Sequence, residues 1–109
     1  MPEVTDEERG RRIFQVHRDR AVESAMEKIR RNLGQDWKLY SALDIEMLKF
    51  ILGECWVFMV RQDWERCSFT RLSRADIDGL IRIGKDIKRD DRLEGEGVGR
   101  AKEILKKVS

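Results

Sequence analysis

The chain has 109 residues, 40% of them charged, and its two signs of charge nearly cancel at a net +2. This length supports one domain with its own hydrophobic core, so no disulfide or structural metal is needed for stability. The even balance is typical of ion-paired helical surfaces and argues against a one-sided tail that binds polyanions.

The sequence does not indicate a membrane protein or a secreted protein. The first residues lack the charged, apolar and small-residue order of a signal peptide. The longest apolar stretch, residues 45–60, contains Glu46, Lys49 and Glu54 and is too short and too charged to span a bilayer. We therefore expect a cytoplasmic protein with no membrane partner.

The first predicted helix covers residues 6–33. Thr5 and Glu8 have the hydroxyl-then-carboxylate spacing of a capping box, with Val4 before them as a hydrophobic staple. Gly34 stands where a left-handed C-cap belongs. Between these ends, apolar residues recur at helical spacing: Ile13, Phe14, Val22, Ala25, Met26, Ile29 and Leu33.

A short turn around Trp37, capped by Asp36, separates this helix from a second one predicted over residues 43–66. Ser41 and Asp44 repeat the capping pattern at its start. One broad apolar face contains Ile45, Leu48, Ile51, Leu52, Cys55, Phe58 and Met59, and further apolar residues lie on the other side. A helix that is apolar on nearly all sides is typical of the centre of a bundle.

Two further helices complete the predicted fold. Ser73 and Asp76 form a third capping pattern before a helix over residues 74–89. Residues 90–97 are polar and glycine-bearing and predict a loop, after which a short amphipathic helix covers residues 98–108. We expect an all-α, single-domain bundle of four to five helices.

The residues that carry catalysis or metal binding are sparse. His17 is the only histidine, and neither Cys55 nor Cys67 has the spacing of a zinc site, so we expect two reduced thiols and no metal. Glu54 lies in the most apolar segment, either on its wetter flank or as an anchor for a basic partner helix. With no convergent titratable groups, we expect neither an enzyme nor a cofactor.

The aromatic residues point to a protein partner. A single helix cannot hide all of them on one side, and any that stay exposed form an apolar patch of the kind that marks interaction surfaces. The candidates are Trp37, Phe50, Trp56 and Trp64. The leading hypothesis is a small, non-catalytic regulatory or assembly protein that binds a protein partner or forms a homo-oligomer.

A C-terminal segment provides the alternative. Leu93, Gly95, Gly97, Ala101 and Ile104 fall at the characteristic places of the helix-hairpin-helix DNA-binding motif, which the segment resembles. The resemblance implies a backbone that approaches phosphate, with amides at the start of the last helix directed at the anion. The segment departs from the motif at Glu96, where the family has an aliphatic plug, and Glu94 adds a second negative charge.

Basic residues extend this alternative onto the third helix. Arg74, Arg82, Lys85 and Arg89 share one face, which is either a solvated, ion-paired surface or part of a basic strip for phosphates. The alternative function is therefore a nucleic-acid-binding module. Its candidate residues are Arg82, Lys85, Arg89, Gly95, Gly97, Arg100 and Lys102.

Overall fold

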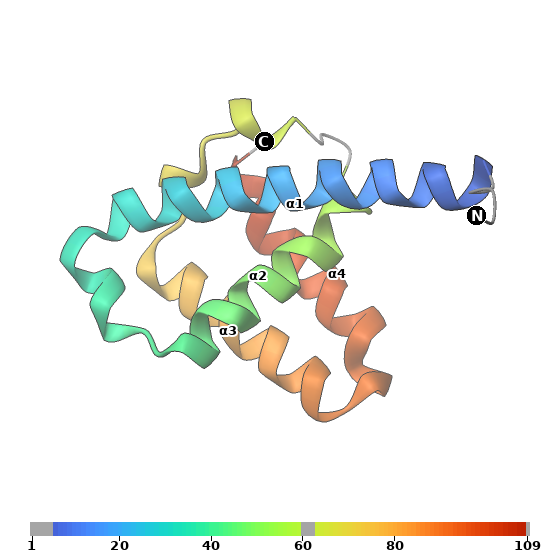
Figure 1. Ribbon diagram of the computed structural model, residues 1–109. Helices are drawn as coiled ribbons and strands as arrows, with labels where there is room; N and C mark the ends of the chain where they lie inside the picture. Colours follow the sequence, from blue (N-terminus) through green and yellow to red (C-terminus); the bar gives the residue numbers. More distant parts are fainter. Residues whose placement is uncertain (1–5, 60–62, 109) are drawn as a thin grey trace.

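The computed structural model describes residues 6–59 and 63–108, and within these ranges the chain is all-α with no strand. The four α-helices are α1 (Asp6–Leu33), α2 (Ala42–Trp56), α3 (Arg74–Arg89) and α4 (Glu94–Leu105). Short 3-10 turns are η1 (Gly34–Leu39), η2 (Trp64–Arg66), η3 (Phe69–Arg71), η4 (Asp91–Leu93) and η5 (Lys106–Val108). The predicted all-α bundle is confirmed (Figure 1).

The predicted bounds of α1 and α3 are confirmed, and so are most of the caps. Gly34 ends α1 with φ at 56°, in the left-handed region that glycine adopts without strain. Ser41 and Ser73 each accept a hydrogen bond from the backbone N–H of the N3 aspartate and donate their own backbone N–H to its carboxylate. The cap expected from Asp36 is wrong, because no side chain caps η1. The staple at Val4 and the cap at Thr5 lie outside the described residues.

The predicted second helix, residues 43–66, is too long, because α2 ends at Trp56. The chain then returns to α1, where the Lys28 ammonium donates to the carbonyls of Trp64 (2.9 Å), Glu65 (2.5 Å) and Cys67 (3.1 Å). If α2 continued, these carbonyls would accept hydrogen bonds from backbone amides four residues further along the chain. Here they accept hydrogen bonds from the Lys28 ammonium on α1. A lysine far away in the sequence therefore holds the returning segment against α1.

The predicted loop over residues 90–97 is also wrong, because α4 begins at Glu94 and not at residue 98. Asp90 caps η4 by accepting a hydrogen bond from the backbone N–H of Arg92 at 3.1 Å. Glu94 and Glu96 then occupy the first turn of α4, where carboxylates stabilise the positive end of the helix dipole. The glycines that suggested a loop are helical residues.

The core surrounds α2, which contacts α1, α3 and α4. This central position is the one that its apolar composition predicts. The α2–α3 crossing is close at Gly84, where an added Cβ would lie 2.8 Å from the carbonyl oxygen of Met47. The largest fully buried side chains are Trp64, Phe69, Ile29, Leu48, Ile51, Leu52, Leu72, Ile77, Leu80, Leu105 and Cys55.

The first half of α1 lies at the edge of this core and touches it through Phe14, whose ring centroid is 5.1 Å from that of Trp56. We call residues 7–20 the arm: every side chain in it is exposed except that of Arg18, which is half-buried. Burial along α1 starts only at Ala21. In Figure 1 the N-terminal end of α1 extends well past the other three helices. The molecule thus consists of a packed body and a helical arm that projects from it.

Candidate interaction surface

The aromatic surface expected from the sequence is largely inside the protein. Trp56 and Trp64 are only 5% and 1% exposed, so the expectation that they form a surface patch is wrong. Trp64 belongs to the segment that returns under α1, and its ring contacts that of Phe69 edge-on, with 5.1 Å between centroids. Trp37 and Phe50 are half-buried against the core. The Lys88 ammonium lies 4.3 Å from the centroid of the Phe50 ring.

Other apolar side chains are exposed instead. Ile13 and Val16 on the arm are 54% and 49% exposed, and Phe58, just after α2, is 57% exposed. Sequence periodicity assigned Ile13 and Phe58 to core faces, but the body is too short to cover the arm, and α2 ends before Phe58. The other large apolar side chains that are exposed are those of Phe14, Leu39, Leu43 and Val57.

Phe58 borders a groove of about 540 Å³ on the surface of α4. The groove is lined by Phe58, Glu94, Gly95, Val98, Gly99 and Lys102. An added Cβ at Gly95 or Gly99 would meet nothing within 4 Å, so α4 presents a low surface there. The Lys102 ammonium lies 6.0 Å from the centroid of the Phe58 ring, at the edge of cation–π range.

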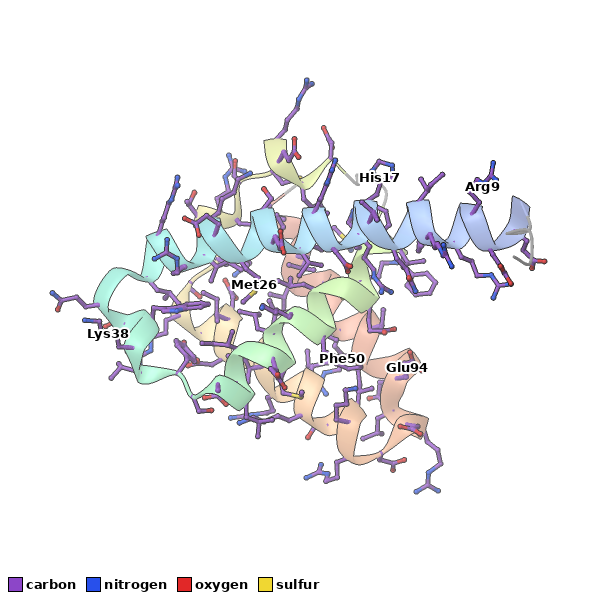
Figure 2. All side chains as sticks on the ribbon, in the orientation of Figure 1. Arg9, His17, Met26, Lys38, Phe50 and Glu94 are labelled. Atoms are coloured by element: carbon purple, nitrogen blue, oxygen red, sulfur yellow. The ribbon has the colours of Figure 1, made fainter. Side chains whose placement is uncertain are left out.

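The groove is lined by one carboxylate, that of Glu94, and by one ammonium, that of Lys102. Glu94, labelled in Figure 2, is exposed, and Glu54 of α2 beside it is half-buried. Burial raises the pKa of Glu54 above its usual value, and a hydrogen bond and charge repulsion from Glu94 raise it further. The wetter-flank placement of Glu54 is thus nearer to the structure than full burial. The positive charges of Arg18 and Lys88 partly offset the rise in its pKa.

The basic residues predicted to bind phosphate are divided between ion pairs and solvent. On α3, Lys85 pairs with Asp44 at 2.6 Å and Arg89 with Asp86 at 3.0 Å. Arg82 and Arg100 are exposed and form no ion pair with a described residue, and Lys102 faces the groove.

The glycines of the hairpin resemblance do not form a phosphate-binding loop. Gly95 and Gly97 both lie in the first turns of α4. Gly97 is buried against α3, where an added Cβ would lie 2.8 Å from Cδ1 of Ile87. Glu94 and Glu96 hold the positive end of α4, the place that an incoming phosphate would need. Helix packing explains Gly97 better than anion binding does.

The nucleophilic side chains are not arranged as a reactive centre. Cys55 and Cys67 are both buried, and burial raises the pKa of the Cys55 thiol to about 12, with Glu54 adding to the shift. A thiol with so high a pKa is a poor nucleophile at neutral pH. His17 lies exposed on the arm. Among residues 6–59 and 63–108, no three His, Cys, Asp or Glu side chains cluster as metal ligands would.

Comparison with known proteins does not assign the chain to a family. We found no family model, curated protein or solved structure that matches it. Within the described helices, none has the length and apolar character needed to cross a membrane. Function must therefore be argued from the surface itself.

Proposed function

We infer that this chain is a non-catalytic regulatory or assembly protein that binds a protein partner or another copy of itself. The observation that carries this proposal is the exposure of Ile13 and Val16 on the outward face of the arm, and of Phe58 at the groove on α4. Exposed apolar side chains that lie next to one another commonly mark an interaction surface. The arm and the groove on α4 thus replace the tryptophans as the candidate surface.

The energetics of an unsupported helix favour the same function. The arm continues a helix that the body already holds from Ala21 onward, so no new nucleation is needed, but the arm itself gains little from tertiary packing. It also contains Gly10, which weakens a helix. A partner that covers Ile13 and Val16 would supply the packing that stabilises helices in most proteins.

Nucleic-acid binding is the second candidate, and one observation favours it. Arg82 on α3 and Arg100 on α4 are exposed and without ion pairs among the described residues, so both are available to phosphate. Such binding would weaken steeply with salt, because each phosphate contact releases counterions. Fluorescence anisotropy of labelled duplex and single strands at two salt concentrations measures it, with Arg82→Glu plus Arg100→Glu as the variant that should lose it.

Photo-cross-linking in cells tests the protein-binding proposal. A photoreactive phenylalanine analogue is placed at Phe58 or Ile13 and, as the matched control, at Lys38, which is exposed at the opposite end of the molecule (Figure 2). We expect protein adducts from positions 58 and 13 and none from position 38. Adducts no more frequent from 58 and 13 than from 38 would overturn the proposal.

A further inference from the structure

The outward face of the arm carries a pair of apolar side chains. Ile13 and Val16 lie three residues apart, on the side of α1 opposite the buried stripe of Ala21, Ala25 and Ile29. Both side chains are about half exposed, at 54% and 49%. The described part of the chain therefore leaves this pair largely uncovered.

Arginines bracket the apolar pair along the same face. Arg9 lies one helical turn before Ile13, and Arg20 lies one turn after Val16. Arg12 adjoins Ile13 at the edge of the face. These three arginines are exposed and form no ion pair with a described residue, whereas the arginines on the body's side of the arm have carboxylate partners. Arg9 is labelled in Figure 2, near the free end of the arm.

This face determines the chemistry of whatever covers it. A guanidinium that loses water on binding needs a carboxylate or phosphate in exchange, while Ile13 and Val16 need apolar contacts. Arg9 and Arg20 are eleven residues apart, which is a rise of about 16 Å or three turns. A matching surface therefore places apolar side chains between anionic groups over a length of about three helical turns.

Three other kinds of partner match this face less well. The phosphate backbone of a nucleic acid would pair with the arginines but offers nothing apolar to the centre of the face. A helix that lies in a lipid surface buries a broad apolar face, and the outward face of the arm has only two apolar side chains. A second arm would bring the arginines of both copies together. An acidic segment of another protein satisfies both the charge and the apolar requirement.

Building on the interaction function above, we propose that the arm binds a different protein through an acidic amphipathic segment of that protein. Apolar side chains of the segment cover Ile13 and Val16, and its carboxylates pair with Arg9, Arg12 and Arg20. Such pairs are frequently bidentate, which fixes the direction of the segment along the arm. A contact of two aliphatic side chains and three arginines is small, of the transient class that buries less than about 1,200 Å².

Charge reversal on the arm tests this proposal. A photoreactive phenylalanine analogue at position 13 is cross-linked in cells, and the cross-linked peptide of the partner is mapped by mass spectrometry. Arg9→Glu plus Arg12→Glu should lower the adduct yield at least about tenfold, because repulsion replaces attraction at two places. The matched control is Arg66→Glu plus Arg71→Glu, which reverses two exposed arginines away from the arm and should leave the yield unchanged.

Reversal of charge in the partner completes the test. We expect the mapped peptide to carry carboxylates on either side of apolar residues, and arginine in place of those carboxylates should restore adducts to the arm variant. The replaced residues are exposed, so circular dichroism of both arginine variants should show unchanged helix content.

The possible outcomes separate this proposal from the broader interaction function. Three results overturn the acidic partner alone: adducts that the arm variant retains, adducts that the charge exchange fails to restore, and adducts that map to a segment without carboxylates or to a second copy of this chain. Adducts from position 58 without any from position 13 do the same. The absence of protein adducts from both positions overturns the acidic partner and the interaction function together.

Discussion

The body and the arm are built from similar residues, but only the body buries them. Ile29 and Ile51 are fully buried between helices, while Ile13 is 54% exposed on the same helix as Ile29. Ile13 and Val16 lie on the opposite side of α1 from the buried stripe of Ala21, Ala25 and Ile29. The difference lies in what faces them: α2, η2 and η3 contact α1, and all the burial lies from Ala21 onward. Apolar residues on one face of a helix therefore do not show that the rest of the same chain buries that face.

The largest expected difference between the two regions is in the free energy of unfolding when an isoleucine is replaced with alanine in each. Ile51→Ala should lower the free energy of unfolding by about 2–5 kcal/mol, because it leaves a cavity in the core. Ile13→Ala should change it by no more than about 0.5 kcal/mol in dilute solution, where the arm is uncovered. Urea unfolding measures both. Equal losses would mean that Ile13 is buried against the body.

Replacing glycine with alanine should change stability in opposite directions in the two regions. At Gly84 the new Cβ would lie 2.8 Å from the Met47 carbonyl oxygen, so Gly84→Ala should destabilise the body by about 1–3 kcal/mol. At Gly10 nothing lies within 4 Å, so Gly10→Ala should stabilise the arm helix by about 0.5–1 kcal/mol. Thermal unfolding gives the first effect, and helix content by circular dichroism gives the second. Tolerance of alanine at Gly84 would contradict the close α2–α3 crossing.

The smallest expected effect is on the stability of the fold at acid pH. Lys107 donates to Asp76 at 2.9 Å, and this hydrogen bond, with those from Ser73, lowers the pKa of Asp76 below its usual value. A carboxyl with a lowered pKa stabilises the fold above the unfolded value of about 3.9, and the stabilisation is lost as the pH falls through the folded value.

Asp76→Asn should therefore flatten the decline of the unfolding free energy in acid, by less than about 1 kcal/mol because Lys107 is largely exposed. Urea unfolding from neutral pH down to acid measures the slope, with Asp19→Asn on the arm as the matched control. An unchanged slope for the Asp76 variant would show that the pair adds nothing to stability.

How far the sequence predicts this fold depends on whether a helix end is set locally. The left-handed glycine at residue 34 and the capping boxes at Ser41 and Ser73 are local, and the ends they mark are confirmed. The segment after α2 is not fixed locally, because Lys28, 36 positions before Trp64, donates to the carbonyl of Trp64. No propensity shows such a contact in advance.

The candidate surface was harder to predict for the same reason. Trp56 and Trp64 are the residue types most typical of interfaces, but tertiary packing places both in the core. Gly97 suggested a phosphate-binding loop, whereas the structure uses it to bring α4 close to Ile87. The informative signal was the run of arginines around Ile13 and Val16, which makes a poor core face.

Hydrogen exchange along α1 tests the central claim, that the body leaves the arm uncovered. We predict that amides of residues 10–20 exchange far faster than those of α2 in dilute protein. An arm as protected as α2 in dilute protein would contradict the account.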